Sequence, residues 1–245
     1  MILLDVKGVS KHFGGLVALD GISFSTEKGE ILGLIGANGA GKTTLFSVLS
    51  GYYTPERGSV VFNGEEVTGK KPYQICRKGM VRTFQVVRPL RNFTVLENVM
   101  VGEMFGRGRR GTQKECRSRA REVLGLVGLS GKESVPAGRL GIADHKRLEL
   151  AKALSTKPDV LLLDEVLAGL TPAETEQAME IIRRAREERG LTILMVEHVM
   201  KAVMGLCQRV IVLHYGIKIA EGTPQEVTQD RRVIKAYLGD AGAEE

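Results

Sequence analysis

The sequence predicts an α/β fold with a mostly parallel core sheet, and three short apolar runs support this prediction. The first, Ile31–Ile35, leads into a glycine-rich segment, residues 36–44. The second run ends in Asp164-Glu165, and the third ends just before Glu197-His198. Short apolar runs of this kind are typical of strands that are buried on both faces. Because the carboxyl ends of parallel strands meet at one edge of a sheet, where ligands bind, we expect a site there.

The glycine-rich segment fits the phosphate-loop pattern G-x-x-x-x-G-K-[ST] without a mismatch. A helical pattern, Thr43–Leu49, follows it. Glycines let backbone N–H groups surround a phosphate, and the start of the helix adds partial positive charge. Lys42 is expected to reach the β- and γ-phosphates, and the Thr43 hydroxyl to hold Mg²⁺. The segment predicts a nucleotide site formed by Gly36, Asn38, Gly39, Ala40, Gly41, Lys42, Thr43 and Thr44.

Composition limits the classes of protein that remain. The chain has 245 residues, of which 43% are apolar and 26% charged, as in an ordinary globular protein. Aromatic residues make up 5% and tryptophan is absent, which argues against a base-stacking surface for single-stranded nucleic acid. The three cysteines are odd in number and widely spaced, so we expect free thiols. We expect no signal peptide and no membrane span, so any membrane role must come through a partner.

The N-terminal part combines antiparallel strands with the nucleotide-binding unit. Leu3–Val9 alternates apolar and polar residues and predicts an exposed strand. A strand over Gly21–Thr26 follows, and Asn63-Gly64 is a strong hairpin signal after a strand near Phe62. Phe13, just upstream of the phosphate loop, either stacks on adenine or covers the core.

A helical segment follows the strand predicted over Met80–Phe84. That strand ends at Gln85, whose amide either reaches a metal or a water, or is simply solvated. Helices are predicted over 97–103 and 114–129, with Arg107–Gly111 between them as a solvated loop or, alternatively, a contact with anionic lipid headgroups. A further helix is expected to begin near Ala143.

The later strands place acid and base groups at the expected sheet edge. Asp164 is expected to bind in the Mg²⁺ shell, and Glu165 to orient or deprotonate the attacking water. Thr171 begins a capping box for a helix that closes at Gly190. A lone histidine is usually structural, but the position of His198 after the third apolar run favours a γ-phosphate contact. A hairpin around Tyr215-Gly216 and helical structure to Leu238 complete the chain.

The order of these features resembles the ATP-binding cassette family. The matching motifs are, in order, the aromatic stacker Phe13, the Walker A segment 36–44, the Q-loop Gln85, the signature 140–144, Walker B Asp164-Glu165, the D-loop Ala168-Gly169-Leu170 and the switch histidine His198. The chain looks most like the cytoplasmic ATPase subunit of bacterial branched-chain amino acid importers, on the segments Phe13–Leu19, Val81–Gln85, Thr94–Asn98 and Val233–Gly239.

The resemblance implies a P-loop NTPase cassette with an N-terminal antiparallel β subdomain and an inserted helical subdomain. It divides one domain, 1–245, into a core with the β subdomain (1–85 and 158–228), a helical subdomain (86–157) and a C-terminal helix and tail (229–245). In this family two cassettes enclose two ATP molecules, and each ATP also contacts the signature of the other subunit. The implied ligands are ATP and Mg²⁺. The implied catalytic residues are Glu165, His198 and Gln85, the metal ligands Thr43, Gln85 and Asp164, and the contacts in trans Gly141, Ile142, Ala143 and Asp144.

The implied partners are a second ABC ATPase subunit and two transmembrane permease subunits, with a substrate-binding protein acting indirectly. No nucleic acid is expected. The location is the cytoplasmic face of the inner membrane, as a peripheral protein. Uptake of amino acids, branched-chain ones first, is the expected function, although amides and urea also fit such a cassette. The alternatives are a soluble ABC ATPase acting on nucleic acid or ribosomes, and a regulatory cassette with weak turnover.

The sequence departs from the family pattern in its signature, which reads Leu140-Gly141-Ile142-Ala143-Asp144 where Leu-Ser-Gly-Gly-Gln is usual. Gly141 lacks a hydroxyl whose hydrogen bond to phosphate is worth ~1.5–3 kcal/mol. Asp144 adds ~2 kcal/mol of repulsion from a phosphate charge at roughly 8 Å, offset where the carboxylate accepts from a ribose hydroxyl. Val166 stands where proline is usual. We therefore expect a weakened signature, a different cassette as partner (a second copy of this chain being the alternative), and two unequal ATP sites.

Overall fold

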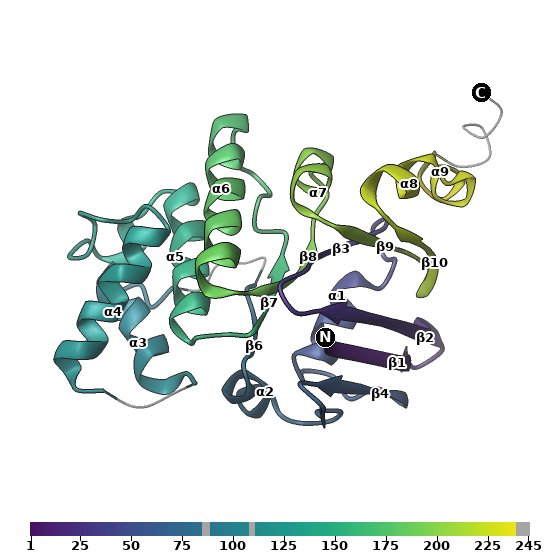
Figure 1. Ribbon diagram of the computed structural model, residues 1–245, viewed down its shortest axis with the longest axis horizontal. Helices are drawn as coiled ribbons and strands as arrows, with labels where there is room; N and C mark the ends of the chain where they lie inside the picture. The colour runs from purple at the N-terminus through teal and green to yellow at the C-terminus, as the bar shows by residue number, and fades with distance from the viewer. Residues whose placement is uncertain (85–88, 108–110, 239–245) are drawn as a thin grey trace. The chain divides into compact units, whose positions relative to one another are not determined.

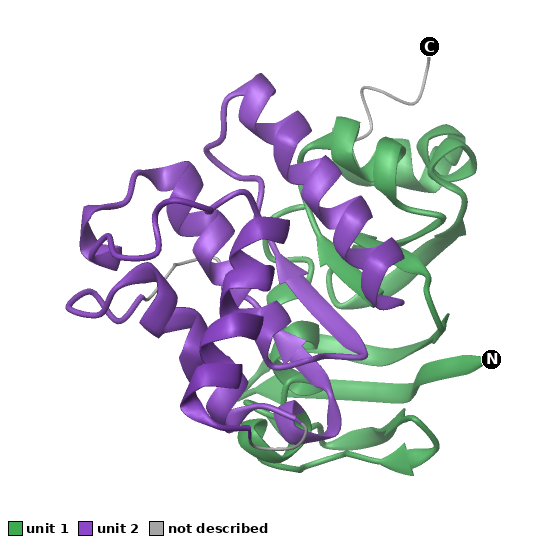
Figure 2. Cartoon of the chain, turned by 60° about the vertical axis from the view of Figure 1, so that its left-hand side comes forward, with its two compact units in different colours: residues 1–75, 192–245 green, residues 76–191 purple. Residues whose placement is uncertain are grey.

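The computed structural model describes residues 1–84, 89–107 and 111–238 (Figure 1). Its internal contacts divide the chain into two compact units, which Figure 2 colours separately. Unit 1 contains residues 1–75 and 192–245, and unit 2 contains residues 76–191. The chain therefore leaves unit 1, builds unit 2, and returns. The division predicted from the family resemblance follows other boundaries and stays a prediction.

Unit 1 contains an antiparallel sheet with strand order β2-β1-β4-β5. Its strands are β1 (Ile2–Phe13), β2 (Leu16–Glu27), β4 (Arg57–Phe62) and β5 (Glu65–Glu66). Val6 of β1 pairs with Phe24 on one side and Val60 on the other. The expectation of an exposed strand over Leu3–Val9 is wrong, because β1 has neighbours on both sides and the apolar side chains of this stretch, Leu4 and Val9 among them, are buried.

The second layer of strands in unit 1 has the order β10-β9-β3-β8. The strands are β3 (Ile31–Ile35), β8 (Thr192–Val196), β9 (Arg209–His214) and β10 (Ile217–Gly222). β3 is parallel to both β8 and β9, and every residue of β3 and β8 is buried. The helices are α1 (Lys42–Leu49), α7 (Met200–Leu206), α8 (Pro224–Gln229) and α9 (Arg231–Leu238). The last two contact β10, as Figure 1 shows.

Unit 2 joins a parallel strand pair to a group of helices. The pair is β6 (Met80–Arg82) and β7 (Val160–Asp164). The helices are α3 (Val95–Phe105), α4 (Gln113–Leu126), the short 3-10 turn Ala137–Arg139, α5 (Ile142–Ser155) and α6 (Pro172–Arg189), while α2 (Pro72–Lys78) carries the chain in from unit 1. Helices α3, α4 and α5 pack against one another (Figure 1). Leu148, Ala151 and Leu154 form the buried face of α5, as their spacing predicts.

Among the described residues, four helices begin with a threonine N-cap whose side chain and backbone exchange hydrogen bonds with a glutamate three residues later. The caps are Thr94, Thr112, Thr171 and Thr223. The capping box predicted at Thr171 is confirmed, and its helix ends at Gly190 with a φ of 62°. Asn63 and Gly64, at φ 50° and 76°, form the predicted hairpin turn.

The predicted α/β class, with a separate antiparallel sheet and a mostly parallel core, is confirmed. In the part of the chain that the structure describes, no helix combines the length and the apolar character needed to cross a membrane.

Candidate functional site

The phosphate loop lies where the sequence predicts it, between the end of β3 and the start of α1. A Cβ atom added to Gly36 would come within 2.3 Å of the Leu213 carbonyl oxygen, and one added to Gly41 within 2.5 Å of the Ala18 oxygen. Gly41 also has a φ of 101°, which favours glycine. The loop therefore follows its path because the backbone of β2 and β9 can approach it this closely.

Lys42 is the buried cation of this loop. Its side chain is 6% exposed, and its ammonium donates to the carbonyl oxygens of Gly36, at 2.6 Å, and Ala37, at 3.0 Å. The N-cap of α1 is Gly41, and among the described residues no side chain caps this helix. The first N–H groups of α1 and the Lys42 ammonium are therefore both at the loop, where they can donate hydrogen bonds to a phosphate. Thr43 is exposed beside them.

The remaining loop positions also suit a bound nucleotide. Asn38 and Gly39 are exposed, whereas Ala40 is buried and its carbonyl oxygen accepts from the Gly216 N–H. The Tyr237 side chain of α9 reaches the same loop. Burial raises the pKa of its hydroxyl, and a hydrogen bond with the Gly36 backbone offsets part of that rise. The C-terminal helix therefore contacts the first residue of the phosphate loop.

Phe13, the predicted adenine stacker, is 41% exposed at the end of β1, so its ring does not fill the core. The ring meets Tyr53 edge to face, with centroids 5.1 Å apart. The Lys11 ammonium lies 5.3 Å from the centroid of Phe13 and 2.6 Å from a Glu56 oxygen. The hydrogen bond from Lys11 is the main cause that lowers the pKa of Glu56 to about 2. This exposed aromatic pair offers a surface on which a purine base can stack.

Asp164 ends β7 and is 3% exposed. Its carboxylate accepts a hydrogen bond from Arg82 at 2.6 Å, and its backbone N–H donates to the Thr83 hydroxyl at 3.2 Å. Arg82 is the last residue of β6 and Thr83 comes directly after it, shortly before the predicted Q-loop. The carboxylate thus has a fixed position in a polar environment, which fits a place in the shell of a metal ion.

Glu165, directly after β7, has a φ of 50°, a conformation that costs a residue other than glycine about 1–3 kcal/mol. Two groups hold its carbonyl oxygen: the Lys146 ammonium at 3.1 Å and the Ala168 N–H at 3.3 Å. The residue that we expect to activate water therefore stands on a turn that the surrounding structure must maintain.

Asp144, in the altered signature, is paired with Lys132 and lies 3.8 Å from an Arg147 nitrogen. The repulsion estimated from the sequence assumed a lone carboxylate, and these cations reduce it. Gly141 is the N-cap of α5 without a side-chain cap, and Ile142 is 68% exposed. Ala143, one position further, is half-buried.

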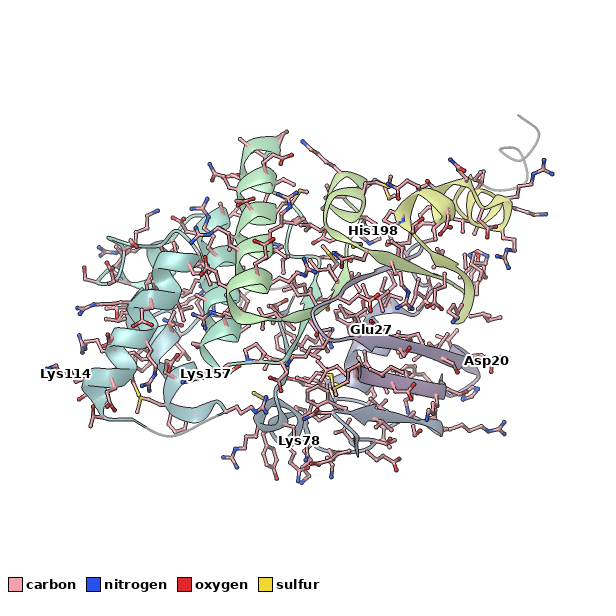
Figure 3. The ribbon with its side chains drawn as sticks, viewed as in Figure 1. Asp20, Glu27, Lys78, Lys114, Lys157 and His198 are labelled. Atoms are coloured by element: carbon pink, nitrogen blue, oxygen red, sulfur yellow. The ribbon has the colours of Figure 1, made fainter. Side chains whose placement is uncertain are left out.

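His198 lies in the turn between β8 and α7, where Figure 3 labels it, and its side chain is exposed. Gln85 lies outside the described residues, as do positions 108–110 of the predicted arginine-rich loop. Of the predicted site residues, the phosphate loop, Phe13 and His198 belong to unit 1. Asp164, Glu165 and the signature belong to unit 2.

Sequence reasoning missed four side chains that the structure places at these residues: Tyr53, Arg82, Lys132 and Lys146. Tyr53 stands out only as part of a tyrosine pair in an aromatic-poor chain. Arg82 lies in the segment Val81–Gln85 that carries the family resemblance, but nothing in the sequence pairs it with Asp164, and Lys132 and Lys146 belong to no motif.

The predicted metal-binding residues suit Mg²⁺, because this ion needs few ligands from the protein. The described residues contain no group of three or more His, Cys, Asp or Glu that could hold a metal ion. Mg²⁺ keeps several waters and takes one or two carboxylates together with substrate phosphates. Within unit 1 the Thr43 hydroxyl is a group of this kind, and within unit 2 the Asp164 carboxylate is another.

Comparisons with known proteins agree with these features. A family model described as ABC transporter matches residues 19–168, and one described as branched-chain amino acid ATP-binding cassette transporter matches residues 218–243. The chain is 38% identical to the high-affinity branched-chain amino acid transport ATP-binding protein BraF of Pseudomonas aeruginosa, and 41% identical to LivG of Salmonella typhimurium. Both alignments extend over 251 residues and cover 98% of each protein.

A crystal structure of an ATP-binding cassette of an ABC transporter, in its ADP conformation, matches with a TM-score of 0.89 and 31% identity. The match covers 98% of this chain and 100% of that one. The resemblance predicted from the motifs is confirmed, and this chain belongs to the ABC transporter family of ATP-binding cassettes.

Proposed function

We propose that this chain is the Mg²⁺-dependent ATPase subunit of an importer of amino acids, with branched-chain amino acids as the cargo. The observation that carries the proposal is the phosphate loop, with the Lys42 ammonium held over the loop carbonyls at the uncapped start of α1. The relatives named above, which span nearly the whole chain, support the choice of cargo.

Each residue has a defined task in this function. The phosphate loop and Lys42 bind the phosphates, and Phe13 with Tyr53 stacks on the base. Thr43 and Asp164 are the proposed ligands of Mg²⁺, which when bound would neutralise phosphate charge. Glu165 orients or deprotonates the attacking water, and His198 contacts the γ-phosphate. Gln85, which the structure does not describe, is proposed to reach the metal ion or the attacking water.

A permease docks on the apolar surface of unit 2. On α3, Val101, Met104 and Phe105 are exposed and recur at helical spacing. Met104 and Phe105 also line a hollow of ≈ 130 Å³ with Gly111 and Cys116. Further exposed apolar side chains lie in the segment before this helix, at Phe84, Leu90 and Phe93. Clustered apolar side chains on a surface mark an interaction site, here for one of the hydrophobic membrane subunits. This docking places the chain at the cytoplasmic face of the inner membrane as a peripheral protein.

The ATPase unit is a pair of cassettes, and we propose that the second one is a different chain. Gly141 supplies no hydroxyl to the partner's ATP, whereas the Walker residues of this chain are intact. The site built on Lys42 and Glu165 then uses the partner's signature and turns over faster than the other site. Glu→Gln blocks placed in one subunit at a time measure each site, and equal rates would contradict the inequality.

The function is tested by purifying the tagged chain from gently solubilised native membranes and identifying the copurifying proteins by mass. We expect two hydrophobic permease chains and a second cassette, and Mg²⁺-dependent ATP hydrolysis that Glu165→Gln reduces to a small residual rate. The binding protein that belongs to the permease then identifies the cargo, by its affinity for leucine, isoleucine and valine. Recovery of ribosomes or nucleic acid in place of a permease would reject the import function. Wild-type turnover in Glu165→Gln would reject the assigned base.

A further inference from the structure

We propose that Lys146 is a positioning residue for Glu165, and that it links the start of the signature helix to the hydrolytic carboxylate of the same chain. The inference rests on the proposed function, in which Glu165 activates water. It concerns unit 2 alone, where both residues lie.

The start of α5 is firmly held, so a side chain projecting from it has a fixed origin. The His145 N–H donates to the Gly141 carbonyl oxygen at 2.9 Å and closes the first turn. The His145 ring contacts the Ala137 carbonyl oxygen, also at 2.9 Å. Arg147 reaches across to α6, where its guanidinium donates to the Gln177 amide oxygen at 2.5 Å. Lys146 lies between two residues that are each fixed to a neighbouring element.

From this origin the Lys146 ammonium reaches the Glu165 carbonyl oxygen at 3.1 Å. The carbonyl oxygen is a main-chain atom, so the contact fixes the peptide plane that follows Glu165 and not the carboxylate itself. The backbone that this contact holds sets the direction in which the Glu165 side chain projects. A charged donor strengthens this hydrogen bond relative to a neutral one.

The Glu165 backbone needs such support, because a φ of 50° is rarely adopted by residues other than glycine. The next residue is Val166, and a proline there would have restricted residue 165 to extended backbone. Valine permits the left-handed conformation but does nothing to enforce it. The hydrogen bond from Lys146 joins the one from the Ala168 N–H in holding the turn.

The Lys146 stem also has a defined environment. It lines a small hollow together with Ala143, Val166 and Leu170. Substitution by methionine keeps an unbranched apolar stem in this hollow and removes only the ammonium. Arginine retains a charged donor. Lys152, on the same helix, donates to the Glu149 carboxylate within α5 and provides a control for the loss of a lysine charge from this helix.

The experiment measures steady-state ATP hydrolysis by the assembled transporter with the wild type, Lys146→Met, Lys146→Arg and Lys152→Met. We expect Lys146→Met to lower kcat by about 10- to 100-fold, the loss that a displacement of about 1 Å at a catalytic group produces. The KM for ATP and the thermal midpoint should stay unchanged, Lys146→Arg should recover most of kcat, and Lys152→Met should match the wild type.

A double-variant cycle tests whether Lys146 acts through Glu165. In the Glu165→Gln background, adding Lys146→Met should leave the residual rate unchanged, because residues that act as a unit are not additive. Wild-type kcat in Lys146→Met, or a further loss in the double variant, overturns the inference. So does a lower thermal midpoint with no recovery by arginine, which would make Lys146 a structural residue. A wild type without turnover would instead reject the proposed function, and wild-type turnover in Glu165→Gln would reject the assigned base.

Discussion

Replacing Arg82 by methionine should destabilise the chain more than any exposed charge substitution does. The guanidinium and the Asp164 carboxylate are 2.6 Å apart, and their side chains are 7% and 5% exposed. Methionine leaves a buried carboxylate without this partner, which costs about 3–5 kcal/mol. The matched control is Arg184→Met, which breaks an i,i+4 pair with Glu188 whose side chains are about half exposed. That pair contributes only about 0.3–0.5 kcal/mol.

Urea unfolding of the purified chain, followed by far-UV circular dichroism, measures both costs. With a slope of about 3 kcal/mol per molar urea, Arg82→Met lowers the midpoint by roughly 1–1.7 M and Arg184→Met by less than about 0.2 M. Adding Asp164→Asn to Arg82→Met should restore much of the loss, because the buried charge is then gone. Equal midpoint shifts for the two arginine variants, or no recovery in the double variant, would refute this account of the buried pair.

Three further predictions concern other parts of the chain. Gly102→Ala should lower the free energy of unfolding by about 1–3 kcal/mol, because its Cβ would lie 1.9 Å from the Ser155 hydroxyl. Gly125 is a helical glycine whose added Cβ would lie 3.7 Å from the nearest atom, so Gly125→Ala should raise this free energy by about 0.5–1 kcal/mol. Both are measured by the same urea assay, and the reverse order of the two variants would contradict the packing. Gly141→Ser, which meets no atom within 4 Å, should raise turnover of the assembled transporter by about tenfold, and an unchanged rate would show that the missing hydroxyl does not limit the signature. Burial raises the pKa of the Cys207 thiol from 9.0 to about 12, so the fold opposes its ionisation and loses stability as pH rises through this range. Iodoacetamide should therefore modify Cys207 at pH 8 roughly 10³-fold more slowly in the folded chain than in urea, as measured by peptide mass spectrometry, and equal rates would rule out this burial.

The sequence was sufficient wherever a local pattern determines local structure. The phosphate loop is found between a fully buried strand and α1, and α6 begins and ends at Thr171 and Gly190, because capping and glycine chemistry act over a few residues. The place of Asp164 at the end of a buried strand follows from the apolar run Val160–Leu163, which would not remain exposed to water. In each case the deciding interactions lie within one or two turns of chain.

What the sequence could not provide is the partner of each charge. Arg82 and Asp164 are 82 positions apart, and neither residue type indicates the other. The contact of Lys146 with the Glu165 carbonyl oxygen depends on how α5 packs, and a backbone acceptor leaves no trace in composition. Alternation in β1 suggested an exposed strand because pattern alone does not reveal whether a strand has one neighbour or two.

The position of β3 between β8 and β9 has a consequence for synthesis of the chain on the ribosome. Leu32 pairs with Leu194 on one side and Arg209 on the other, so both neighbours are made long after β3 itself. At about 5–20 residues per second, the roughly 160 residues that separate β3 from β8 take some ten to thirty seconds to translate. Throughout that interval a nascent chain carries a five-residue apolar strand without its sheet partners, followed by a phosphate loop that has no β9 to pack on. Nucleotide binding is therefore a property that the chain acquires only near the end of its synthesis, and β3 is the segment that a chaperone must protect until then.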